Sequence, residues 1–224
     1  MGAPAFAPAR ATLNAWLLHP VAKPLLFALA LLPFVLLARG AFTDQLGANP
    51  AEALIRATGD WALRFLCITL AITPVRVVLG LAPLVRLRRM AGLFTYFYGL
   101  LHLLTYAWFD MGFDAAEIVR DIAKRPFILV GFLSLVMLTP LAATSFNRAV
   151  KVLGGRRWQA LHKIVYLIAG LVLLHFFWMR AGKNDFNEVA AYAAILSVLL
   201  GWRFARWWRE PHRPSAPMRP NPSP

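Results

Sequence analysis

Residues 158–179 read WQALHKIVYLIAGLVLLHFFWM, an apolar stretch with one histidine near each end. At about 1.5 Å of rise per residue, a helix of this length crosses a bilayer. His162 and His175 would then lie roughly 20 Å apart along one helix axis. Ionisable side chains are costly inside a membrane span and usually serve a function, so both histidines are candidate site residues.

The rest of the chain has the composition of a polytopic membrane protein. Hydrophobic residues make up 59% of the 224 residues, and the mean hydropathy is +0.58. We expect an all-α fold, a six-helix transmembrane bundle over residues 21–206. A cytoplasmic segment, 1–20, precedes it, and a proline-rich, disordered cytoplasmic tail, 207–224, follows. The predicted spans are about 21–38, 61–79, 91–109, 127–145, 158–179 and 188–204.

The charge pattern gives the orientation of the bundle. A net charge of +14 could suggest nucleic acid, but the basic residues lie in short connections between the spans. The positive-inside rule accounts for that placement, so we expect no nucleic acid as a partner. With both termini in the cytoplasm, sixteen of the 24 Lys and Arg residues fall on the inner side. The single Cys67 excludes a disulfide framework and a cysteine-rich metal centre.

Three of the five histidines lie inside predicted spans, at two depths. His102 precedes Asp110 by eight residues and His175 precedes Arg180 by five, which puts both roughly 8–12 Å from the outer boundary. These two histidines can therefore face each other across spans three and five. His162 lies near the inner boundary, too far away for a single three-histidine metal centre. Each histidine could alternatively make only a hydrogen bond between helices.

Two facing imidazoles in an apolar, aromatic-rich bundle suit b-type haem, which offers one axial position on each side. Gly99 and Gly92 lie on the same side of their span as His102 and leave room for a porphyrin. Small residues at these positions also favour plain helix packing. Electron transfer is the expected task, because two imidazole ligands suit one-electron transfer better than oxygen chemistry.

Four segments carry a family resemblance: LGANPAEALIRATGDWALRFLCITLAITPVR at 46–76, RRMAGLFTYFYGLLHLLTY at 88–106, TSFNRAV at 144–150 and GGRRWQALHKIVYLIAGLVLLHFFW at 154–178. They closely resemble the MsrQ (YedZ) family, haem-binding membrane subunits within the ferric-reductase-like transmembrane group. The likeness runs from about Ala41 to Trp202.

The resemblance implies two stacked haems between spans three and five, with two histidines contributed by each span. His162 and His175, 13 residues apart, match the family spacing on span five. Span three keeps His102 but has Arg88 and Arg89 where its inner histidine would stand. The resemblance thus implies an outer haem on His102 and His175, and one ligand for an inner haem, His162.

The second ligand of an inner haem stays open. That haem could be five-coordinate, could take His19 or Met90, or could be absent. Arg88 and Arg89 could contact haem propionates or a flavin phosphate, since guanidinium groups suit paired anion contacts. They could also only fix the topology of the chain.

The resemblance also implies a task. Such a subunit is not an enzyme by itself and carries electrons through haem b from the quinone pool or a cytosolic flavin reductase. The acceptor is MsrP, a periplasmic molybdopterin-containing methionine sulfoxide reductase that repairs oxidised periplasmic proteins. The chain would be a multi-pass protein of the bacterial inner membrane. FMN is a further cofactor that the resemblance implies, and no catalytic residue is expected.

Two other functions stay open from the sequence. A stand-alone ferric or oxygen reductase would react through its own haem at the outer surface. A non-redox transporter would use the histidines to relay protons or to bind a metal ion. Absence of b-type haem from the purified protein would exclude both redox functions. Reduction of iron or oxygen without a partner protein would favour the stand-alone reductase.

Overall fold

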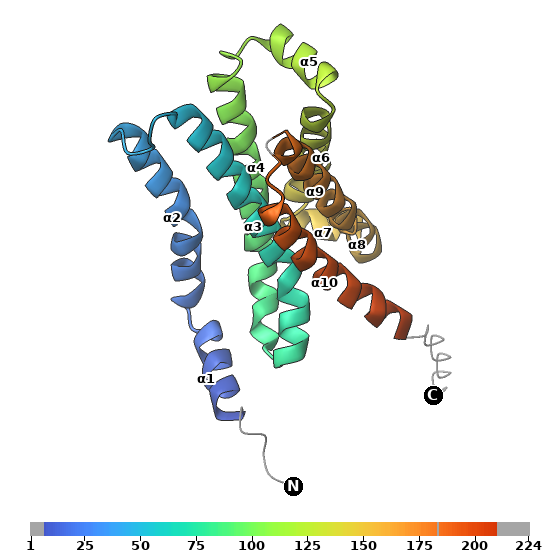
Figure 1. Ribbon diagram of the computed structural model, residues 1–224. Coiled ribbons are helices and arrows are strands. Elements are labelled where there is room, and N and C mark those ends of the chain that lie inside the picture. Colours follow the sequence, from blue (N-terminus) through green and yellow to red (C-terminus); the bar gives the residue numbers. More distant parts are fainter. Residues whose placement is uncertain (1–6, 183, 210–224) are drawn as a thin grey trace, which may run out of the picture.

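The structure is a computed structural model that describes residues 7–182 and 184–209, and over this range it contains helices and no strand (Figure 1). This confirms the predicted all-α fold. The elements are α1 (Ala7–Leu18), α2 (Ala22–Phe42), α3 (Pro50–Leu79), the 3-10 helix η1 (Ala82–Leu87), α4 (Arg88–Phe109), α5 (Ala115–Lys124), α6 (Pro126–Ala143), α7 (Asn147–Leu153), α8 (Gly155–His162), α9 (Val165–Ala181) and α10 (Asn187–Arg209).

Five helical segments of the described chain are long and apolar enough to cross a membrane: Ala22–Phe42, Pro50–Leu79, Pro126–Ala143, Gly155–Ala181 and Asn187–Arg209. The chain is therefore a multi-pass membrane protein. The third predicted span, 91–109, coincides with α4, which is not among the five. Its tyrosines, threonines and histidine lower its hydropathy. The predicted tail begins inside α10, which continues to Arg209, and residues 210–224 lie outside the described part of the chain.

The long helices form a bundle with α3 and α4 side by side at its centre (Figure 1). Helix α6 packs on α4 and on α9, and α10 packs on α3 and α9. Helix α5 crosses one end of the bundle, and η1 lies at the other end, where it contacts α1, α3 and α4. We call these the α5 end and the η1 end. Helix α2 packs on the outer side of α3.

Helix α3 is the main support of the bundle, and the sequence specifies both of its ends. Asn49 caps it, because the Asn49 side chain accepts a hydrogen bond from the backbone N–H of Glu52, and Pro50 occupies the first turn. It ends at Gly80, whose φ of +66° favours glycine. Its buried residues Leu66 and Leu70 pack against α9 and α10, and Cys67 belongs to the same apolar cluster.

Helix α2 is held to the bundle by Tyr98 of α4, which is fully buried. The Tyr98 hydroxyl donates a hydrogen bond to the carbonyl of Ala30 (2.8 Å) and accepts one from the N–H of Phe34 (3.1 Å). Pro33 lies between these two residues and cannot donate to the helix ladder. A tyrosine from the neighbouring helix therefore pairs the polar backbone groups beside the proline.

We expect Tyr98→Phe to weaken the attachment of α2. Hydrogen bonds between membrane helices contribute about 1 kcal/mol each, so the midpoint of thermal unfolding in detergent should fall by about 2–4 °C. Tyr96→Phe is the matched control, because within the described residues no hydrogen bond of the Tyr96 hydroxyl is found. Equal midpoints for the two variants would contradict this role of Tyr98.

The predicted fifth span is two helices. Helix α8 ends at His162 and α9 begins at Val165, with a turn at Lys163 and Ile164 between them. In this turn, the N–H of Ile164 donates to the carbonyl of Leu161 at 3.1 Å. His162 and His175 therefore lie on two consecutive helices within the single apolar segment Gly155–Ala181, where the sequence predicted one uninterrupted helix.

Candidate cofactor-binding site

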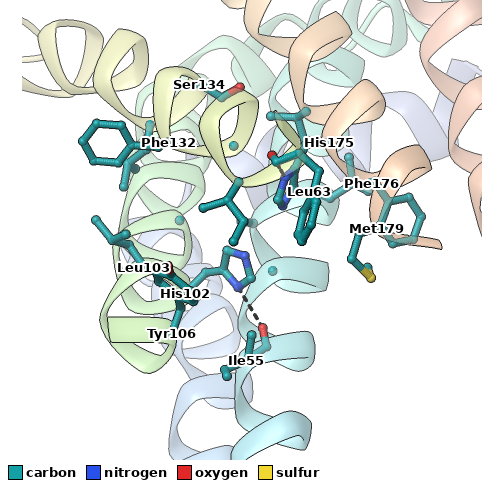
Figure 2. Close-up of a pocket in the computed structure, with 18 of the residues that line it drawn as sticks. Ile55, Leu63, His102, Leu103, Tyr106, Phe132, Ser134, His175, Phe176 and Met179 are labelled. Carbon is teal, nitrogen blue, oxygen red and sulfur yellow. Dashed lines mark hydrogen bonds between the residues drawn. The ribbon is translucent and has the colours of Figure 1, made fainter. Parts of the chain in front are cut away.

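A cavity of about 490 Å³ lies between α3, α4, α6 and α9, and His102 and His175 both line it (Figure 2). We call it the outer cavity. Its volume is in the range of ligand sites, roughly 300–1,000 Å³. Most of its wall is apolar, with Leu63 and Phe176 beside the histidines. Such a wall limits the contact of water with whatever the histidines hold.

The two imidazole rings face each other across this cavity, as the sequence predicted. Their centroids are 6.1 Å apart and their planes meet at 71°. The Nδ1 atom of His102 lies 2.8 Å from the carbonyl oxygen of Ile55 on α3, and that of His175 lies 2.6 Å from the carbonyl oxygen of Phe127 on α6. Carbonyl oxygens only accept, so each Nδ1 carries the proton. Each Nε2 is then left with a free lone pair.

This separation fits one metal ion held between the two rings. A metal–imidazole bond of about 2 Å on each side, with about 1 Å from each nitrogen to its ring centre, gives a centroid separation of about 6 Å. The carbonyl contacts also match the usual arrangement of a metal-bound histidine, whose other N–H donates to a carbonyl or carboxylate. His102 and His175 therefore fit the axial positions of a haem iron.

Two glycines lie directly against the two histidine rings. A Cβ atom on Gly59 of α3 would lie 3.1 Å from the His102 ring, and a Cβ atom on Gly131 of α6 would lie 2.7 Å from Nδ1 of His175. Contacts under 3.0 Å force a neighbour to move, so the second position leaves no space for a side chain. Each ring is thus pressed against the backbone of the helix that accepts its hydrogen bond.

A second cavity of about 1060 Å³ lies towards the η1 end, and we call it the inner cavity. His162 lines it, and within the described residues no hydrogen-bond partner is found for the buried Nε2 atom of His162. Its Nδ1 lies 3.0 Å from the carbonyl oxygen of Trp158, and the two rings stack at a centroid distance of 3.9 Å. The cations that line this cavity are Arg76, Arg88, Arg89, Lys163, Arg203 and Arg206.

The inner cavity brings His162 together with Arg88 and Arg89, as the sequence predicted. Arg89 donates a hydrogen bond to the Asn147 side chain at 2.8 Å, whereas Arg88 begins α4. The two alternative partners of His162 are elsewhere. Met90 packs in the aromatic cluster around Tyr98, and His19 is exposed between α1 and α2. Neither of these two residues lines the inner cavity.

The sequence predicted that Gly99 and Gly92 leave room for a porphyrin. Gly99 lines the outer cavity and Gly92 lines the inner cavity. Three residues line both cavities: Leu66 of α3, Thr95 of α4 and Leu138 of α6. One layer of side chains therefore separates the two sites. Within the described residues, no group of three or more His, Cys, Asp or Glu side chains could hold a metal ion.

The backbone groups that pair with the two histidines were not predicted from the sequence. The carbonyl groups of Ile55 and Phe127 have no sequence signature, since every residue has one. The glycines behind the rings did leave a signal. Gly59 and Gly131 lie inside long helices, where glycine costs about 1 kcal/mol relative to alanine and so indicates a close approach.

Comparison with known proteins gives consistent matches. Residues 58–173 match the family described as "Ferric reductase like transmembrane component"; the match ends two residues before His175. The chain is 69% identical over 198 residues to "Protein-methionine-sulfoxide reductase heme-binding subunit MsrQ" of Polaromonas naphthalenivorans, which covers 88% of this chain and 90% of that one. The MsrQ subunit of Herminiimonas arsenicoxydans is 54% identical over 188 residues, 84% of this chain and 86% of that one.

A further relative is the magnetosome protein MamZ of Magnetospirillum gryphiswaldense, with 42% identity over 191 residues. The matched region covers 83% of this chain but 29% of the magnetosome protein. No solved structure matches the chain.

Proposed function

The chain belongs to the MsrQ family of heme-binding subunits of protein-methionine-sulfoxide reductases, with a ferric-reductase-like transmembrane region, and we propose that it carries electrons across the bacterial inner membrane to MsrP. MsrP is the periplasmic, molybdopterin-containing subunit that repairs oxidised methionines in proteins. The observation that carries the proposal is the facing pair His102 and His175, whose ring separation fits an iron between them.

His102 and His175 hold the outer haem b in this proposal. Haem iron with two imidazole ligands supplies one-electron transfer when bound. The Ile55 and Phe127 carbonyls fix the orientation of the two rings and keep each proton on Nδ1. The apolar wall keeps water from the site and gives it a low dielectric constant. The chain itself carries no catalytic residue and is not an enzyme alone.

His162 holds an inner haem in the second cavity. Its buried, unpaired Nε2 supports this assignment, because an imidazole nitrogen left in that state costs free energy unless something binds it. Arg88 and Arg89 contact the anionic groups of the inner cofactor. FMN is the other anionic cofactor that would suit this cavity, because its phosphate could be met by the same guanidinium groups. The chain thus carries one or two haems.

The topology of the proposal has six spans, with α4 as the third. Helix α4 lies between α3 and α6 and carries His102, so the outer cavity is complete only with α4 in the membrane. The η1 end faces the cytoplasm, because the connections there hold most of the basic residues. Both termini are then cytoplasmic. Electrons enter at the η1 end from the quinone pool or a cytosolic flavin reductase.

The proposal is tested on the purified protein in detergent. The reduced-minus-oxidised spectrum should show b-type haem with six-coordinate iron, and the reduced protein should be reoxidised by added MsrP in the presence of methionine sulfoxide. Reoxidation by ferric chelates or oxygen at the same rate without MsrP would favour a stand-alone reductase. A protein that binds no haem would contradict every redox function.

A further inference from the structure

The outer cavity is polar at one end only. Its charged lining residues belong to the half nearer the α5 end: Glu52, Arg56, Asp60, Asp110 and Arg125. The other half is closed by Leu66, Leu138 and Ile168, and its Thr95 and Ser134 hydroxyls donate to backbone carbonyls of their own helices. A planar ligand with an apolar edge and an anionic edge would therefore place its anionic edge at the α5 end.

Arg56 and Arg125 are the cations among the described residues that line the outer cavity. Arg56 follows Ile55, whose carbonyl holds His102. Arg125 lies two residues before Phe127, whose carbonyl holds His175, and its guanidinium carbon is 6.0 Å from the centre of the Phe127 ring. Each arginine is thus tied by the chain to one of the two histidine sites, on α3 and at the start of α6.

Both guanidinium groups are already oriented by a carboxylate one helical turn away. Arg56 pairs with Glu52 through Nη2. Arg125 pairs with Asp121 of α5 through Nε (2.6 Å) and Nη2 (2.5 Å). Asp121 is itself fixed, because it accepts a 2.5 Å hydrogen bond from the Tyr106 hydroxyl. The pairing with Asp121 uses one edge of the Arg125 guanidinium and leaves the Nη1 edge for another anion.

We propose that Arg56 and Arg125 form the carboxylate-binding site of the outer cavity and hold the two propionate groups of the outer haem. The inference rests on the proposed function, since it needs haem between His102 and His175. The other charged residues of this rim, Glu52, Asp60 and Asp110, are acidic and repel carboxylates. The propionates therefore bind at the two arginines, and this determines which edge of the macrocycle faces the α5 end.

The test compares haem b with its dimethyl ester, in which both propionates are uncharged. Apoprotein carrying His162→Ala, so that the outer pair alone can ligate, is titrated with each compound. Haem b should bind more tightly than the ester, by about tenfold for each arginine, because hydrogen bonds between charged groups contribute about 1.5–3 kcal/mol. Arg56→Gln and Arg125→Gln should each remove about tenfold of this preference, and the double variant nearly all of it.

Arg120→Gln is the control, since Arg120 lies on α5 and pairs with Glu117 but does not line the cavity. It should keep the full preference for haem b. Equal affinity for haem b and its ester in the His162→Ala protein, with both arginines intact, would overturn the inference. So would an unchanged preference in the double variant. In both cases a six-coordinate spectrum would still support the proposed function. If neither compound binds, both the inference and the proposed function are wrong.

Discussion

Replacing either His102 or His175 with alanine will abolish the six-coordinate haem signal of the outer cavity. The two ring centroids are 6.1 Å apart, which would allow one iron to be held between them, and within the described residues no other histidine lines this cavity. Loss of one ring removes one axial ligand completely. The expected result is loss of the low-spin spectrum in both variants, measured on purified protein by absorption and electron paramagnetic resonance spectroscopy.

Added imidazole separates a lost ligand from a misfolded protein. Imidazole should restore the six-coordinate signal of the His175→Ala variant, because it can enter the space left by the ring. His19→Ala is the control, since His19 is exposed and outside both cavities. His162→Ala should keep the outer signal and lose only haem bound in the inner cavity. Full haem content in both the His102 and the His175 variants would refute the pairing.

Gly131→Ala should weaken haem binding by about 10–100-fold, the usual effect of disturbing the partner of a metal-bound histidine. The new Cβ atom would lie 2.7 Å from Nδ1 of His175, so the ring must move away from the Phe127 carbonyl. The hydrogen bond that orients the ring would then be lost. Haem affinity by titration, or the rate of haem transfer to apomyoglobin, measures the effect.

Gly170→Ala is the matched control on α9. A Cβ atom at Gly170 would meet nothing within 4 Å, so haem affinity should not change. Gly59→Ala should give an intermediate result, because its Cβ atom would lie 3.1 Å from the His102 ring, where a shift of a few tenths of an ångström is enough. Equal affinities for the Gly131 and Gly170 variants would mean that the His175 ring is not confined by α6.

The pairing of His102 with His175 could be predicted because depth in a membrane follows from residue count. Rise per residue is constant in a helix, so two histidines at similar distances from the outer boundary were expected to lie at similar depths. The partners of their Nδ1 atoms could not be predicted in this way. They depend on which helices pack together, and a backbone carbonyl looks the same at every position.

The ends of the elements were predictable where side chains determine them. Asp114, three residues before Glu117, is a sequence signal for a helix start, and in the structure its side chain accepts from the N–H groups of Ala116 and Glu117 to begin α5. The connection between the predicted spans 91–109 and 127–145 therefore holds a helix whose start the sequence signals. The turn at Lys163 has no such signal, because neither proline nor glycine stands there.

Helix α4 has a consequence for how the protein is made. The residues that keep it below the hydropathy of a membrane span include His102, Thr95 and Tyr106, which line the outer cavity. Helix α3 is among the segments that are apolar enough to cross a membrane, and α4 packs against it. Insertion of α3 and α4 as one hairpin would place α4 in the membrane and complete the wall of the outer cavity in a single step.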